Sequence, residues 1–140
     1  MALQHLSSEQ LRSLVFDQMP EAAIVADPGG IVRLWNRGAE ALFGFPAAQA
    51  VGASLDLIIP EKLRRAHDAG FRRALTTGQM KFEGRVMTTR ATHQQGHSLY
   101  VDFSFGLLKD DAGELLGVLA IGRDVTARQL EQRAARPPGA

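Results

Sequence analysis

The chain has 140 residues, of which 45% are hydrophobic and 22% are charged, and its formal net charge is +1. This profile is typical of one globular domain with enough apolar material for a core, and it gives no support for nucleic-acid contact by this domain. The chain contains no cysteine. That excludes zinc–cysteine sites, cysteine nucleophiles and photoreceptors that work through a cysteine adduct.

Recognisable targeting signals are missing from the sequence. No apolar run approaches the roughly 20 residues that a membrane helix needs. The N-terminal MALQHLSSEQ lacks the basic and apolar regions of a signal peptide. We therefore expect a cytoplasmic domain without a membrane segment.

The first part of the chain predicts a helix, a hairpin and several short helices. SSEQLRSLVFDQM (7–19) predicts an amphipathic helix that begins at Ser7 or Ser8 and ends before Pro20. AAIVAD and IVRLWN predict two strands joined by the turn sequence DPGG (27–30). NRGAEALFGFP and AAQAVGASLDLIIP then predict short helical segments.

IIPEKLRRAHDAGFRRALTTG (58–78) predicts a longer helix that begins after Pro60 and ends at Gly78. His67 lies on its apolar face, while the arginines at 64, 65, 72 and 73 lie on a face that we interpret as solvated. The other members of the apolar face are Leu63, Ala66, Gly70, Phe71, Ala74 and Leu75. A histidine in this position is either a packed core residue or a ligand to a bound group, and the spacing alone leaves both open.

The last part of the chain predicts three strands and a helix. KFEGRVMTTRAT (81–92) and LLGVLAIGRDVT (115–126) are strand-like, and SLYVDFSFGLL (98–108) alternates apolar and polar residues. ARQLEQRAA then predicts the start of a helix. His93 and His97 flank the turn sequence HQQGH, so we interpret them as exposed turn residues rather than metal ligands.

Strands and helices are therefore segregated along the chain, which predicts an α+β fold. We expect a five-stranded antiparallel sheet with helices on one face, and terminal helices or a second subunit on the other. The expected organisation is an N-terminal amphipathic helix (1–19), a central domain (20–126) and the start of a C-terminal helix or linker (127–140).

Three segments together resemble the PAS domain family: IVRLWNRGAEALFGFPAAQAVGASLDLIIP, HDAGFRRALTTG and GVLAIGRDVTARQLEQ. The resemblance implies a sheet that forms a cup, helices that close it, and a small molecule or nothing between them. It also implies a sensor or dimerisation module rather than an enzyme. The light-sensing members carry a cysteine that this chain lacks.

A narrower resemblance is to the haem-binding, oxygen-sensing PAS domains. It implies haem b with His67 as the iron ligand. It places Phe82, Phe103 and Phe105 on the distal apolar side, and Arg85 and Met87 at distal polar and coordinating positions. Met87 stands where the family carries an arginine, and Arg85 stands two residues earlier. We expect these two residues to share one face of a strand.

Two alternatives to haem stay open. One is a flavin such as FAD or a metabolite in the same cup. Trp35 and Asn36 could contact a flavin ring, although we interpret Trp35 as a core residue and Asn36 as the N-cap of the next helix. The other is a ligand-free module in which the N-terminal helix joins a homodimer. We find no catalytic triad, acid–base pair or phosphate loop.

The resemblance also implies how a signal would leave the domain. Asp124, Val125 and Thr126 match the family's motif at the end of the last strand, and Arg123 precedes them. A ligand would shift the sheet and, through Arg123, Asp124 and Thr126, the C-terminal helix of a homodimer. The implied outputs are a histidine kinase of a two-component system, a cyclic-di-nucleotide enzyme or a transcription activator.

Overall fold

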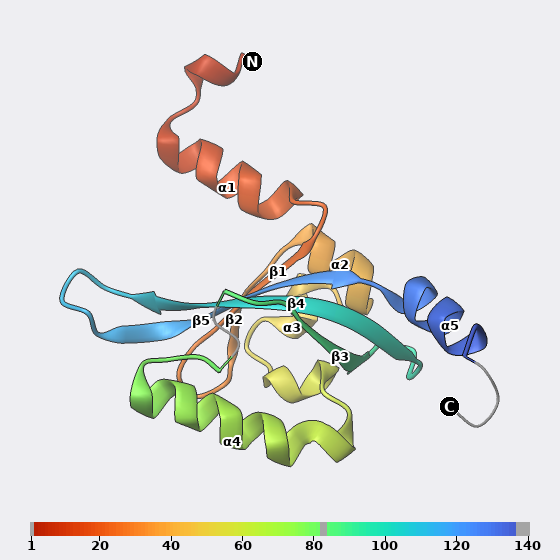
Figure 1. The fold of residues 1–140 in the computed structure, drawn as a ribbon. Helices are drawn as coiled ribbons and strands as arrows, with labels where there is room; N and C mark the ends of the chain where they lie inside the picture. Colours follow the sequence, from red (N-terminus) through yellow and green to blue (C-terminus); the bar gives the residue numbers. More distant parts are fainter. Residues whose placement is uncertain (1, 82–83, 137–140) are drawn as a thin grey trace.

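A five-stranded antiparallel sheet forms the centre of the molecule (Figure 1). The computed structural model describes residues 2–81 and 84–136. The strands lie in the order β2-β1-β5-β4-β3, and all neighbouring strands are antiparallel. The predicted α+β architecture is confirmed. In chain order the elements are η1 (Leu3–His5), α1 (Ser8–Gln18), β1 (Ala22–Ala26), β2 (Val32–Trp35), α2 (Arg37–Phe43), α3 (Ala47–Ala50), η2 (Leu55–Ile58), α4 (Glu61–Thr77), β3 (Met87–Thr92), β4 (Ser98–Lys109), β5 (Leu115–Asp124) and α5 (Thr126–Ala134).

The alternation predicted for β4 is confirmed, and it defines the inner face of the sheet. Leu99, Val101 and Phe103 are buried, and Phe105 is half-buried on the same side. The short helices pack against this face. Their apolar residues join those of the strands in one core: Ala22, Ile24, Val32, Trp35, Ala39, Phe43, Ala50, Ile58, Ala91, Leu99, Val101 and Phe103. The predicted place of Trp35 in the core is therefore confirmed.

Turn residues end the elements where the sequence predicts. In the β1–β2 turn the carboxylate of Asp27 accepts hydrogen bonds from the backbone N–H groups of Gly29 and Ile31, at 2.9 and 3.1 Å. Gly44 and Gly78 follow α2 and α4 with φ angles of 82° and 71°. These left-handed conformations favour glycine, because a Cβ atom makes them unfavourable for other residues.

Asn36 connects three elements from one buried position. Its side chain is 1% exposed, and its Oδ1 atom accepts hydrogen bonds from the backbone N–H groups of Ala23 (2.8 Å) and Ala39 (2.9 Å). Its Nδ2 atom donates to the carbonyl oxygens of Phe16 (2.9 Å) and Glu21 (3.1 Å). The predicted N-cap role is confirmed, and the same amide also fixes the end of α1 against β1 and α2.

Glycine permits the close approach of α2 to β1. A Cβ atom on Gly38 would lie 2.2 Å from the carbonyl oxygen of Glu21, a distance that no side chain can adopt without a backbone shift. Because Gly38 follows Asn36 by two residues, the hydrogen-bonded amide and the close packing lie in the same turn of the chain.

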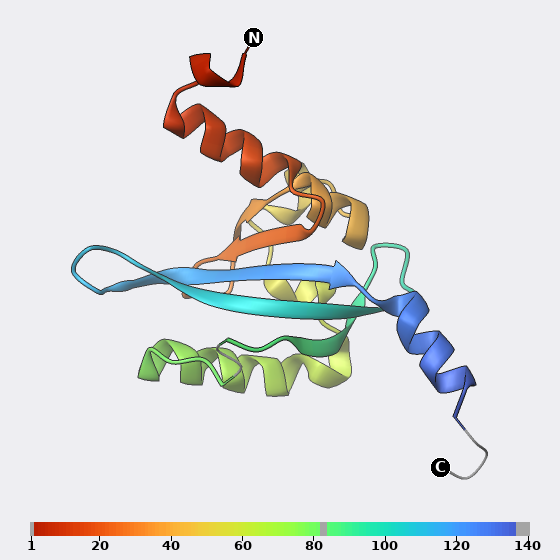
Figure 2. The same ribbon diagram turned by 45° about the horizontal axis from the view of Figure 1, so that its top comes forward.

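The terminal helices and α4 lie on different sides of the sheet. Figure 2 shows α1 on the outer side and α4 on the inner side. The predicted N-terminal helix begins at Ser8, with Ser7 as its N-cap in a capping box with Gln10. None of the residues of α1 or α5 is buried, so these helices cover the outer face only in part. The division at residues 19 and 126 stays a prediction.

Replacement of Asn36 by alanine is expected to lower the free energy of unfolding by about 3 kcal/mol, because four backbone groups lose their side-chain partner. Urea denaturation at pH 7 measures this change. The matched control is Gln94→Ala, which removes one exposed side-chain hydrogen bond to Gln49. We expect the control to change stability by less than about 0.5 kcal/mol. Equal effects of the two variants would contradict the connecting role of Asn36.

Candidate functional site

The candidate site lies between α4 and the inner face of the sheet. Helix α4 runs along this side of the molecule (Figure 1). The residues of α4 that are buried or half-buried recur at helical spacing: Leu63, His67, Phe71, Ala74 and Leu75. Ala66 and Gly70 were expected on the same face but are exposed, because they lie at its edge. Only Ala74 is fully buried, so most of this apolar stripe keeps partial contact with solvent.

His67 stands in the middle of this stripe. Its side chain is 35% exposed, and its ring stacks on that of Phe71 with 5.8 Å between centroids. Among the buried side-chain nitrogen and oxygen atoms of residues 2–81 and 84–136, Nδ1 of His67 is the one without a hydrogen-bond partner. A buried polar atom without a partner costs free energy, and such atoms recur at sites that bind something.

Burial lowers the pKa of His67 below its ordinary value, and the negative charges of Asp68 and Asp56 partly oppose this effect. Desolvation has this sign because it disfavours the charged imidazolium. The imidazole is therefore neutral at pH 7, which is the protonation state that a metal ligand requires.

Two carboxylates lie near the imidazole. A carboxylate oxygen of Asp68 is 3.8 Å from Nδ1 of His67, beyond hydrogen-bonding distance. One potential ligand atom from each of Asp56, His67 and Asp68 lies within 4.8 Å of the others. Arg64 fixes the neighbouring segment, since its guanidinium donates to the carbonyl oxygens of Ile59 (3.0 Å) and Asp56 (3.2 Å). Arg64 remains exposed, as expected for the solvated face of α4, while it makes these two hydrogen bonds.

Aromatic side chains form the opposite wall. Phe103 stacks on Phe43 and on Phe105, with 6.4 and 5.6 Å between ring centroids. Met87 lies opposite Phe103 in the β3–β4 ladder and is half-buried, so its side chain lies on the inner face. Met87, Phe103 and Phe105 therefore lie on the inner face of the sheet.

The expected position of Arg85 on one strand face with Met87 is wrong. Strand β3 begins at Met87, so Arg85 lies in the bend before the strand and does not share a strand face with Met87. Its side chain is exposed, and the guanidinium donates to the carbonyl oxygen of Lys81 at 3.2 Å. A glycine with a φ angle of 74°, Gly84, turns the chain just before this point. Phe82 falls outside the described residues.

The predicted transmission residues form the junction between β5 and α5. The carboxylate of Asp124 accepts hydrogen bonds from the backbone N–H and the hydroxyl of Thr126, at 2.9 and 2.6 Å. The Thr126 hydroxyl in turn accepts from the backbone N–H of Tyr100 at 2.9 Å. Arg123 forms an ion pair with Glu21, with 2.8 Å between Nε and the carboxylate. These bonds attach the start of α5 to β4 and the end of β5 to the segment before β1.

Further contacts that were not predicted from the sequence hold α5 against the outer side of β4. The guanidinium of Arg133 on α5 lies 5.1 Å from the ring centroid of Tyr100, and the guanidinium of Arg90 on β3 lies 5.6 Å from the same centroid. Arg128 donates to Asp102 at 3.0 Å. The Thr88 hydroxyl, and to a lesser degree Arg128, hold the pKa of Asp102 below its usual value. The polar positions of the alternating pattern in β4 could have indicated these contacts, because Tyr100 and Asp102 share the outer face.

The fold and these residues define a PAS domain. A family model described as the PAS fold matches residues 16–130, and the chain belongs to this family. The sensor protein FixL of Bradyrhizobium diazoefficiens is 29% identical over 122 residues, which are 87% of this chain and 24% of FixL. The oxygen sensor protein DosP of Escherichia coli is 25% identical over 120 residues, which are 86% of this chain and 15% of DosP.

Solved structures agree with the fold. The PAS domain of a protein from Colwellia psychrerythraea superposes with a TM-score of 0.76 at 23% identity, covering 87% of this chain and 100% of that one. The predicted family and its closer similarity to oxygen-sensor members are confirmed. The chain spans about a quarter or less of the length of these sensor relatives. No helix within the described residues is long and apolar enough to span a membrane.

The lowered pKa of His67 predicts a pH dependence of stability. Between its folded-state pKa and the unfolded value of about 6.5, the unfolded chain binds more protons, so the free energy of unfolding rises with pH. We expect the urea midpoint to fall as the pH is lowered from about 7.5 to about 5.5. His67→Gln should flatten this fall, while His5→Gln, on an exposed segment, should keep it. If the urea midpoints of the wild type and His67→Gln fell in parallel with pH, the attribution of the pH dependence to His67 would be contradicted.

Proposed function

We propose that this PAS domain is a haem-based gas or redox sensor in which His67 is the iron ligand. The observation that carries the proposal is the partly buried, neutral imidazole of His67, whose Nδ1 atom has no hydrogen-bond partner among the described residues. It stands on the half-buried face of α4. The similarity to the oxygen sensor protein DosP supports the same reading.

The side chains of this candidate site suit haem. Haem, when bound, would supply an iron centre that binds a diatomic gas or changes its oxidation state. His67 would hold the iron through a ring nitrogen, and the nearby carboxylate of Asp68 would orient the ring by accepting a hydrogen bond from Nδ1 after a small side-chain movement. Phe103 and Phe105 would exclude water from the opposite side.

Met87 and Arg85 would have different roles on the distal side. The thioether of Met87 lies on the inner face and would offer the iron a ligand that a gas could displace, since soft sulfur suits iron. The guanidinium of Arg85 points to the backbone of Lys81 instead. It would reach a bound gas only after leaving that carbonyl, so ligand binding and the bend before β3 would be coupled.

The signal would leave through the β5–α5 junction. Ligand binding would bias the position of β4 and β5, and the hydrogen bonds of Asp124 and Thr126 would transfer this bias to α5. We propose that α5 continues to an output region in a homodimer. A histidine kinase, a cyclic-di-nucleotide enzyme and a transcription activator are the candidate outputs. A flavin or metabolite sensor and a ligand-free dimerisation module are the alternatives.

The absorption spectrum tests the cofactor. Protein reconstituted with haem is expected to show a Soret band, and His67→Ala should weaken haem binding by at least about tenfold, because the axial bond is lost. The matched control is His93→Ala, a histidine whose ring packs on Gly44 and His97 in the β3–β4 hairpin. A Soret band that is unchanged in His67→Ala would refute the ligand assignment. A flavin spectrum of the purified protein would favour the first alternative.

The junction is tested by hydrogen exchange. Thr126→Val removes the hydroxyl that bridges Asp124 and the N–H of Tyr100, so we expect faster amide exchange throughout α5. Thr126→Ser keeps the hydroxyl and should exchange like the wild type. Unchanged exchange in Thr126→Val would mean that the threonine does not hold α5 on the sheet.

A further inference from the structure

Three potential metal ligands meet where η2 approaches α4. Asp56 belongs to η2, and His67 and Asp68 are consecutive residues of α4. One ligand atom from each of them lies within 4.8 Å of the other two. The imidazole distinguishes this cluster from an ordinary acidic surface patch, because histidine is the side chain that most often binds transition metals.

The three side chains have no other partner for their ligand atoms. Nδ1 of His67 is buried and has no hydrogen-bond partner among the described residues. In the same part of the chain the carboxylate of Asp56 forms no ion pair, and that of Asp68 has only the 3.8 Å contact with Nδ1 of His67. Like charges repel at this distance, and a buried nitrogen without a partner costs free energy. A cation bound between them would remove both costs.

The backbone of Asp56 is held in place on both sides. Its N–H donates to Oγ of Ser54 at 3.1 Å, and its carbonyl oxygen accepts from the guanidinium of Arg64 at 3.2 Å. Arg64 donates also to the carbonyl oxygen of Ile59, so its guanidinium is directed at the backbone. The segment that carries Asp56 is thereby fixed against α4, while the carboxylate of Asp56 is left for a cation.

The types of ligand atom select a class of ion. Ca²⁺ and Mg²⁺ prefer oxygen ligands, whereas an imidazole with carboxylates suits Zn²⁺ and the neighbouring first-row metals. Bonds to Zn²⁺ are about 2.0–2.2 Å long, so ligand atoms around one ion lie roughly 3–3.5 Å apart. Small rotations of the two aspartate side chains would bring the cluster to this spacing. Asp68 is exposed, so an ion can enter from solvent and keep a water in its fourth position.

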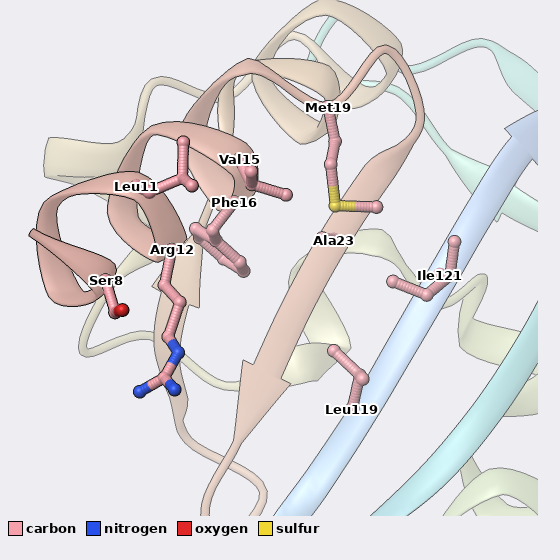
Figure 3. A pocket seen from close by; sticks show the side chains of 9 residues that line it. All are labelled: Ser8, Leu11, Arg12, Val15, Phe16, Met19, Ala23, Leu119 and Ile121. Carbon is pink, nitrogen blue, oxygen red and sulfur yellow. The ribbon is translucent and has the colours of Figure 1, made fainter. Parts of the chain in front are cut away.

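Two other places are poorer candidates for such an ion. Figure 3 shows the groove between α1 and the outer face of the sheet; its lining is apolar apart from Ser8 and Arg12 and includes no imidazole or carboxylate. The rings of His93 and His97 stack with 4.3 Å between centroids. Nδ1 of His93 already accepts from the N–H of Gln95 at 3.0 Å, and no third ligand joins the pair within the described residues.

The imidazole of the cluster is also the proposed iron ligand. A neutral imidazole has one nitrogen with a free lone pair and one that carries a proton, so it binds one metal at a time. In the proposed haem site Nδ1 of His67 would donate to Asp68, which leaves Nε2 for the iron. In a cation site Nδ1 would itself be the ligand. The two modes of binding require opposite tautomers of His67 and therefore exclude each other.

We propose that Asp56, His67 and Asp68 bind one divalent transition-metal ion of the Zn²⁺ class, and that this ion competes with haem for His67. The cation site rests on the residues of the cluster alone. The competition rests also on the proposed function, because it requires that haem binds His67.

Cobalt titration of the haem-free protein tests the cation site. Co²⁺ gives visible absorption bands when it is bound by imidazole and carboxylate, and we expect Zn²⁺ to displace it, since Zn²⁺ binds such sites more tightly. Asp56→Asn keeps the shape of the side chain and removes its charge, so it should weaken Co²⁺ binding by at least about tenfold, as should His67→Ala. The matched controls are Glu61→Gln, in the first turn of the same helix, and His93→Ala; both should bind Co²⁺ like the wild type.

The nitrogen chemical shifts of the imidazole give a second measurement that needs no variant. We expect Zn²⁺ to shift the resonance of Nδ1 of His67 and to leave Nε2 protonated. A shift that shows coordination through Nε2 overturns the assigned geometry. Absence of Co²⁺ binding, or binding that Asp56→Asn and His67→Ala leave unchanged, overturns the cation site.

Haem reconstitution with and without Zn²⁺ tests the competition. Zn²⁺ at about ten times its dissociation constant should lower the apparent haem affinity of the wild type about tenfold, and it should have no such effect on Asp56→Asn. If both bind without affecting each other, the competition is overturned and the cation site stands. If the protein takes up no haem, the proposed function and the competition fail together, while the Co²⁺ titration still decides the cation site.

Discussion

The buried amide of Asn36 is the interaction on which the arrangement of the elements depends. A single side chain accepts from β1 and α2 and donates to the end of α1 and to the segment before β1. An amide is suited to this position because it carries two acceptor lone pairs and two donor hydrogens, and here all four are used. A carboxylate would leave both carbonyl oxygens without a donor, a hydroxyl would leave at least one of the four backbone groups unpaired, and an apolar side chain would leave all four unpaired.

This connection keeps the two faces of the sheet distinct. On the inner side, α2, α3 and η2 pack tightly and contribute to the core, whereas α4 keeps only Ala74 fully buried. The part of the inner face under α4 is therefore less tightly packed than the rest. On the outer side, α1 and α5 each attach through a few polar contacts and leave apolar surface exposed. The two faces of the sheet therefore differ in how tightly the helices cover them.

The proposed signal connects these faces through β4 and β5. Phe103 and Tyr100 belong to the same strand, but one faces the α4 side and the other faces α5. A movement of β4 would therefore change the contacts of Tyr100, Asp102 and Thr126 with α5. Neither face can move alone, because side chains on both sides share one backbone. A strand with side chains packed on both faces is a physical basis for transmitting a movement from one face of the sheet to the other.

The sequence by itself determined the elements, the sheet and the family. Alternation in 98–108, helical spacing in 61–77, and the turn residues Asp27, Gly44 and Gly78 act locally, so they can be read along the chain. The half-buried position of His67 and the inner-face positions of Phe103 and Phe105 followed from the same periodicities. Only the tertiary structure decided which polar groups meet. The four hydrogen bonds of Asn36 and the approach of Asp56 to His67 join residues that are well separated in the chain. The position of Arg85 outside β3 depends on where the β3–β4 ladder ends. Such contacts arise from the packing of whole elements, and a periodic pattern carries no information about them.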